Sequence, residues 1–131
     1  MGICTMPGAA LDLTYDDEGN TWDFSIASQR RKAEGLLEQQ RPMLLIGSPM
    51  CTPFSNIQNF NKARRDPGVV KKEIDNASIH LAWCCKLHRQ QVRKRAHLLH
   101  EHPNAATSWT ERCIMEVLVL DEVGRVIADQ C

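Results

Sequence analysis

The sequence of 131 residues is long enough for one domain with a hydrophobic core, and 43% hydrophobic and 24% charged residues are ordinary values for a soluble globular protein. The formal net charge of +0 argues against a general polyanion binder, and no apolar run reaches the about 20 residues that span a bilayer. Six cysteines without a CxxC pair, and no visible signal peptide, predict a reduced intracellular protein, cytoplasmic or nuclear, with no membrane partner.

Hydrophobic periodicity and turn residues predict alternating strands and helices. In chain order they are a strand at 9–14, a turn at 16–20, a helix at 25–40, a strand at 43–47, a helix at 67–95, a strand at 97–101, a helix at 109–118 and a strand over 117–128. The expected helix caps are Ser25 or Thr21, then Asp66 followed by Pro67, then a capping box of Ser108 and Glu111. The wholly apolar strand at 43–47 is of the kind that is buried on both faces.

This alternation predicts an α/β fold, a sandwich with a mostly parallel sheet and helices on both faces. We expect a single domain over residues 1–131 and, because both ends of the sequence look cut, a fragment of a longer chain. Parallel sheets bind ligands beyond the carboxyl ends of their strands. Here those ends are the segments 14–23, 47–55 and 101–109.

The segment 46–55, with the sequence IGSPMCTPFS, places one cysteine in a loop directly after an apolar strand. Pro49 and Pro53 fix the backbone on either side of Cys51 and limit the movement of its thiol. Cys51 is therefore a candidate nucleophile, although cysteines are commonly buried and inert. No histidine or helix N-terminus is adjacent in the sequence to activate it.

Glu101 stands in the stretch LHEHP, at the end of the next apolar strand. A carboxylate is costly to bury there without a partner, so Glu101 is a candidate general acid or hydrogen-bond partner for a polar substrate. A solvated glutamate at the rim of the sheet is the alternative.

Histidines and one cysteine recur at helical spacing as His80, Cys84 and His88, and His100 and His102 follow on a strand. Such side chains can bind zinc, but three of them on two helical turns span about 12 Å at 1.5 Å per residue. No zinc signature matches this spacing, so we expect no metal.

A basic run without acidic residues lies at the end of the helix predicted at 67–95. It consists of Lys86, Arg89, Arg93, Lys94 and Arg95. These residues form a candidate nucleic-acid-binding face. The alternative is that they are simply the solvent-exposed face of the helix, without a binding role.

Two motifs, GSPMCTPFS and LLHEHP, resemble motifs of the DNA cytosine-5 methyltransferases, in which a Pro-Cys-Gln-x-Phe-Ser loop follows one strand and Glu-Asn-Val ends the next. The string from ALDLT through WDFS, these two motifs and ATSW to DQC also resembles a methyltransferase-related segment of retroelement-type polyproteins. The resemblance implies a partial methyltransferase-like, Rossmann-like sandwich that acts on DNA or RNA.

The resemblance also implies roles for individual residues. Cys51 would attack C6 of a flipped cytosine, and Glu101 would hydrogen-bond the edge of the base. The expected substrate-binding residues are Ser48, Pro49, Phe54, Ser55 and His102. The donor would be S-adenosylmethionine, with Asp12 and Asp23 as candidate contacts.

The chain departs from the cytosine-5 pattern at several positions. Met50 replaces the proline before the cysteine, Thr52 replaces glutamine, and no glycine-rich donor loop precedes the motifs. The alternatives are therefore a degenerate domain, a nucleic-acid-binding module without chemistry, or an assembly module of a larger polyprotein.

Overall fold

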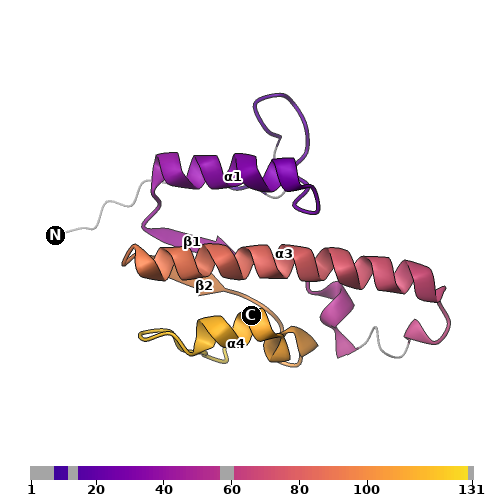
Figure 1. Ribbon diagram of the computed structural model, residues 1–131. Helices are drawn as coiled ribbons and strands as arrows, with labels where there is room; N and C mark the ends of the chain where they lie inside the picture. The colour runs from indigo at the N-terminus through magenta and orange to yellow at the C-terminus, as the bar shows by residue number, and fades with distance from the viewer. Residues whose placement is uncertain (1–7, 12–14, 57–60, 130–131) are drawn as a thin grey trace. The chain divides into compact units, whose positions relative to one another are not determined.

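The computed structural model describes residues 8–11, 15–56 and 61–129 (Figure 1). Contacts between residues divide the chain into two compact units, Met1–Pro42 and Met43–Cys131. Within the described residues the secondary structure is α/β, with three α-helices and one two-stranded parallel sheet.

The unit Met1–Pro42 contains a tight turn followed by helix α1, Ala27–Gln40. Tyr15 and Thr21 form an isolated antiparallel bridge around the predicted turn, in which Gly19 has a φ of 81°. The strand predicted at 9–14 is absent from its described residues 9–11, and residues 12–14 lie outside the described part of the chain.

The predicted caps of this first helix are wrong, because the residue at its N-cap is Ile26 and no side chain caps it. Ser25 instead donates hydrogen bonds to the carboxylate of Asp23, from its backbone N–H at 2.9 Å and from its hydroxyl at 2.7 Å. Ser25 therefore lies one residue before the N-cap, and its side chain is used in a local serine–aspartate contact rather than in capping the helix.

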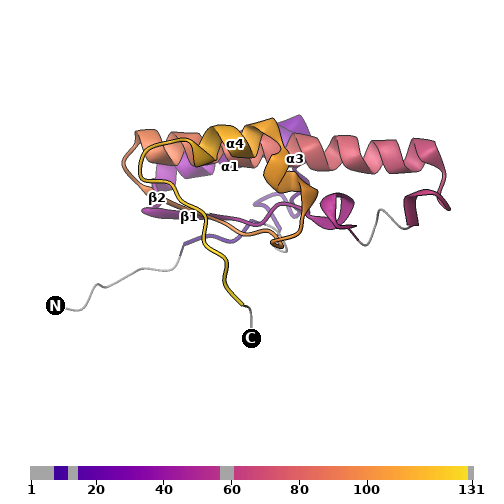
Figure 2. The same ribbon diagram turned by 90° about the horizontal axis from the view of Figure 1, so that it is seen from below.

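The unit Met43–Cys131 is built around one strand–helix–strand unit. Its elements are β1, Leu44–Gly47, the short 3-10 helix η1, Thr52–Phe54, then α3, Pro67–Arg93, β2, His97–His100, the 3-10 helix η2, Thr107–Thr110, and α4, Arg112–Leu118. The two strands pair in parallel, with Leu44 opposite His97 and Gly47 opposite His100. In Figures 1 and 2 both strands lie along one side of α3.

Helix α3 begins as the sequence predicts. The carboxylate of Asp66 accepts a hydrogen bond from the backbone N–H of Val69 at 3.0 Å, and Pro67 occupies the first turn, where its missing N–H costs nothing. The helix has 27 residues, and those that are buried lie between Ala77 and Gln91. Its first turns therefore extend beyond both strands, as Figure 1 shows.

The hydrophobic core of this unit lies between α3, α4 and the loops that follow the strands. It consists of Phe54, Ala77, Leu81, Cys85, Ala106, Ile114 and Val117. On α3, Ala77, Leu81, Cys84 and His88 are buried at steps of three and four residues, so they mark the face of the helix that turns inward.

Two predictions about the sheet are wrong. Strand β1 is not buried on both faces, because Leu44 and Ile46 are 49% and 60% exposed, and Leu99 opposite Ile46 is 52% exposed. The strand predicted over 117–128 does not form among its residues, all of which are described: residues 117–118 end α4, and the stretch after them pairs with no strand. Val126 in this stretch is 86% exposed. Its sequence favours a strand, but no neighbouring strand among the described residues pairs with it.

Candidate functional site

The loops that follow β1 and β2 lie next to each other at the carboxyl ends of the two strands. The backbone N–H of Glu101 donates to the carbonyl of Gly47 at 3.1 Å, which continues the pairing of the strands by one residue. Beyond this bond, the hydroxyl of Ser48 donates to Oε2 of Glu101 at 3.3 Å. The two loops are therefore neighbours at one end of the sheet.

Cys51 is a half-buried free thiol at the start of η1. Its carbonyl accepts the backbone N–H of Phe54 at 2.9 Å, so the loop turns sharply just after the cysteine. Pro49 and Pro53 are both buried, which anchors the loop on either side of the thiol, while Met50 remains 60% exposed. The loop thus holds Cys51 in a defined place without enclosing it.

His102 connects the two loops through both of its ring nitrogens. Its Nε2 lies 2.8 Å from the carbonyl oxygen of Pro49, and its Nδ1 lies 2.6 Å from the hydroxyl of Ser108. A carbonyl only accepts, so Nε2 carries a proton, and in the neutral ring the hydroxyl of Ser108 then donates to Nδ1. Since His102 is 8% exposed and fully bonded inside the protein, it fixes the loop before Cys51.

The capping box predicted from Ser108 and Glu111 is wrong. Glu111 is the N-cap of α4 but caps nothing with its side chain, and Ser108 is fully buried in η2 beside His102. The neighbouring Thr107 donates from its hydroxyl to the carbonyl of Phe54 at 3.1 Å. Residues 102–108 therefore hold the loop 49–54 at two points.

The expected substrate-binding residues separate into two groups. Pro49, Phe54 and His102 are buried and support the loops, whereas Ser48 is exposed and Ser55 is half-buried. Of this set, the serines are the side chains that a ligand at the edge of the sheet can reach.

A pair of histidines that the sequence did not connect lies beneath the sheet. His88 of α3 and His100 of β2 share a hydrogen bond of 3.1 Å between Nε2 and Nδ1, and their rings meet edge to face with centroids 5.3 Å apart. Burial lowers the pKa of His88 to about 4, and burial together with the charges of the neighbouring His102 and His88 lowers the pKa of His100 to about 3. Both rings are therefore neutral near pH 7.

Gly47 allows His88 to pack directly against the backbone of β1. A Cβ at this position would lie 2.9 Å from Cε1 and 3.0 Å from Nε2 of His88, and 3.0 Å from Sγ of Cys84. Burial raises the pKa of the Cys84 thiol to about 12, so this cysteine is an inert packing residue rather than a thiolate. Among the described residues no group of three or more His, Cys, Asp or Glu side chains could hold a metal ion.

A cavity of about 160 Å³ lies near the histidine pair, between α3, β2, α4 and residues 123–126. Cys85, His88, His100 and Trp109 contribute to its wall, and neither Cys51 nor Glu101 does. The cavity and the edge of the sheet are therefore two separate places in the same unit.

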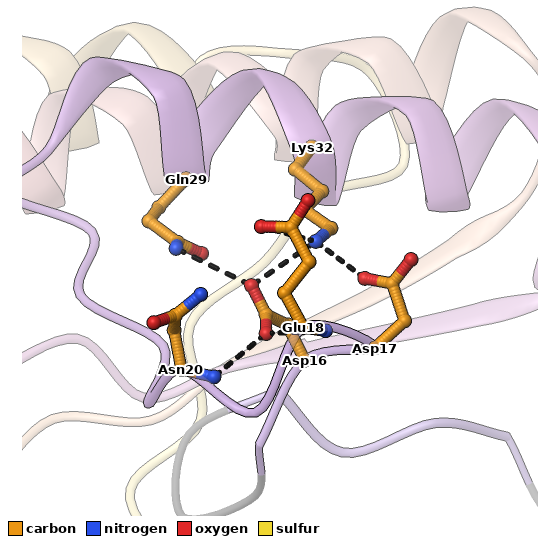
Figure 3. A network of polar contacts seen from close by, with 6 residues as sticks. All are labelled: Asp16, Asp17, Glu18, Asn20, Gln29 and Lys32. Atoms are coloured by element: carbon orange, nitrogen blue, oxygen red, sulfur yellow. Dashed lines mark hydrogen bonds and ion pairs between the residues drawn. The ribbon is translucent and has the colours of Figure 1, made fainter.

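The acidic segment of the unit Met1–Pro42 is organised by one lysine (Figure 3). The carboxylate of Asp16 accepts the backbone N–H groups of Glu18 and Asn20 at 3.0 and 2.8 Å, and Lys32 of α1 contacts it at 3.0 Å. These bonds lower the pKa of Asp16 to about 2, and the bond from the backbone N–H of Asn20 has the largest effect. Burial acts in the opposite direction but does not outweigh them. Lys32 also pairs with Asp17, so the acidic turn is fastened to the helix.

The two candidate donor contacts, Asp12 and Asp23, remain predictions. Asp12 lies outside the described part of the chain, and Asp23 uses its Oδ1 to accept both bonds from Ser25. Asp23 therefore serves the turn before α1.

The basic run at the end of α3 is exposed, except that Arg89 is half-buried and pairs with Glu116 of α4 at 3.1 Å. Lys86, Arg93, Lys94 and Arg95 have exposed side chains. Cations at this end also complement the negative end of the helix dipole, so their position has a structural reason as well.

No helix among the described residues is long and apolar enough to cross a membrane. Comparison with models of protein families returns no match, and comparisons with curated proteins and with solved structures return none either.

Proposed function

We propose that the unit Met43–Cys131 is a methyltransferase-like domain that acts on a nucleic-acid base, with its site at the carboxyl ends of β1 and β2. The observation that carries this proposal is the contact between Ser48 and Glu101, which brings the carboxylate to the loop that holds Cys51. A thiol and a carboxylate following adjacent parallel strands are the arrangement that the two sequence motifs imply.

In this proposal the thiol of Cys51 gives its proton to water and its sulfur adds to C6 of a cytosine, which opens the C5–C6 double bond. A proton passed along the hydrogen bond between Glu101 and N3 of the base neutralises the charge that the addition places on the ring. The base must leave its stack to reach both groups. The buried His102 keeps the loop of Cys51 in register with Glu101, since it follows Glu101 in the chain and binds the carbonyl of Pro49.

S-adenosylmethionine is the methyl donor that the sequence resemblance suggests. Its candidate contacts Asp12 and Asp23 remain predictions, and Asp23 accepts a hydrogen bond from the hydroxyl of Ser25. We therefore assign no step to the donor, and its binding is a separate question that calorimetry answers.

The test needs no donor. Addition of a thiolate to C6 of cytosine makes the hydrogen at C5 exchangeable, so an oligonucleotide deuterated at C5 should lose deuterium to water in the presence of the protein. We expect Cys51→Ser to abolish this loss and Glu101→Gln to slow it by about a hundredfold, within the range of general acid–base contributions. Cys113→Ser, at another half-buried free cysteine, is the matched control. No exchange above the rate in buffer would overturn the catalytic proposal.

A second candidate is an assembly module of a larger polyprotein, of the retroelement type that the sequence resembles. The observation in its favour is the apolar face formed by Leu44, Ile46 and Leu99, all about half exposed, on a sheet of a type that is usually covered on both faces.

A further inference from the structure

The cavity of about 160 Å³ beside β2 has a wall that is mainly apolar. Its aliphatic and aromatic lining includes Leu98, Trp109, Ile114, Val117, Leu118 and Val123. Leu99 and Val126, at 52% and 86% exposed, also line it and mark the side on which it opens to solvent. A dry apolar cavity of about 150 Å³ in another protein binds benzene, so this one has the size for a single aromatic ring.

The wall selects against charged ligands. Among the described residues that line the cavity, Arg125 alone carries a permanent charge, and its guanidinium is already engaged. It lies 4.0 Å from the centre of the Trp109 ring and donates to the carbonyl of Asn104 at 3.0 Å. A charged ligand would therefore be desolvated without a free counter-charge, which is costly.

The histidine pair supplies the polar part of the wall. Nδ1 of His88 and Nε2 of His100 are buried and have no hydrogen-bond partner among the described residues, while the other two ring nitrogens bond to each other. A neutral pair joined by one such bond leaves one N–H and one lone pair, whichever tautomers are present. Because an unmade buried hydrogen bond is expensive, a ligand group that donates or accepts would be favoured here.

We propose that this cavity binds a small neutral aromatic molecule with one hydrogen-bonding group, of the size of phenol or indole. The ring lies among Trp109, Ile114 and Val117, with its polar group toward the wall formed by His88 and His100. The two unpartnered nitrogens lie just below that wall, so a small turn of either histidine ring brings one of them into hydrogen-bond reach. This site is distinct from that of Cys51 and Glu101, so its occupation can be tested without any assumption about the chemistry there.

The experiment is calorimetric titration of the full chain at pH 7 with phenol, toluene and benzoate. Phenol and toluene have nearly the same shape, so the difference in their affinities reports the hydrogen bond minus the cost of removing the hydroxyl from water. We expect saturable one-to-one binding of phenol, binding of toluene that is about three- to tenfold weaker, and no binding of benzoate. The absence of saturable phenol binding to the folded protein at millimolar concentration would overturn the proposal, and equal binding of phenol and toluene would remove the role of the histidines.

Two valine-to-phenylalanine variants, one inside the cavity and one outside it, test where phenol binds. Val123→Phe fills the cavity from its half-buried wall and should weaken phenol binding at least tenfold. Val119→Phe adds the same ring at a position that is 79% exposed and does not line the cavity, and it should leave binding unchanged. If Val123→Phe does not fold, Leu118→Phe fills the same space, and unchanged phenol binding in a folded filling variant would refute the location.

Discussion

The close approach of Gly47 to His88 gives the sharpest prediction about stability. In the variant Gly47→Ala the new methyl group would lie 2.9 Å from Cε1 of His88 and 3.0 Å from Sγ of Cys84, where packed carbons usually keep 3.5 Å or more. His88 cannot easily withdraw, because it is 1% exposed and bonded to His100. We expect the free energy of unfolding to fall by about 1–3 kcal/mol, the usual cost of an overpacked core.

The measurement is urea unfolding of both proteins, followed by circular dichroism. Gly124→Ala is the matched control, since a methyl group there meets nothing within 4 Å. The double variant Gly47→Ala, His88→Ala tests the cause: the cost of the alanine at 47 should largely disappear once the ring is absent. A Gly47→Ala protein as stable as the wild type, or an equal cost in both backgrounds, would refute the reasoning.

Two further predictions concern acid and charge. The pKa of His88 is about 4 in the folded state and 6.5 in the unfolded chain. Between pH 4 and pH 6.5 the unfolded chain therefore binds more protons than the folded protein does. Stability should therefore fall as the pH drops from 6.5 to 4, by up to about 3 kcal/mol, and equal urea midpoints at pH 7 and pH 5 would contradict this. If the end of α3 contacts phosphates, Arg93→Glu with Arg95→Glu should weaken oligonucleotide binding at least tenfold and reduce its salt dependence. Lys71→Glu with Lys72→Glu, at the exposed opposite end of α3, should have little effect, and equal losses in the two double variants would argue against a local basic site.

The parts of the fold that the sequence predicts are those with local signals. The apolar runs gave the positions of β1 and β2, and Asp66 with Pro67 gave the start of α3. The parallel pairing of β1 with β2 agrees with the mostly parallel sheet that the alternation of strands and helices predicts.

The parts that could not be predicted depend on partners far away in the chain. Val126 and Ile127 have strand-forming side chains, but a strand needs a neighbour, and they remain 86% and 70% exposed. Ser108 fits a capping pattern three residues before Glu111, yet its hydroxyl bonds to His102 instead. The spacing of the histidines indicated a shared face of α3. The approach of Gly47 to His88 could not be predicted, because the two residues are 41 positions apart and no local sequence pattern connects them.

The length of α3 has a consequence for how the unit opens. At 1.5 Å per residue its 27 residues extend about 40 Å, and no residue before Ala77 is buried. The first turns are held by local contacts, such as the cap of Asp66 and the ion pair of Lys71 with Asp75 at 2.7 Å. Fraying of this end therefore exposes no core, and the amides of the first ten residues can exchange with solvent through local opening, at a much lower free energy than those beside the sheet.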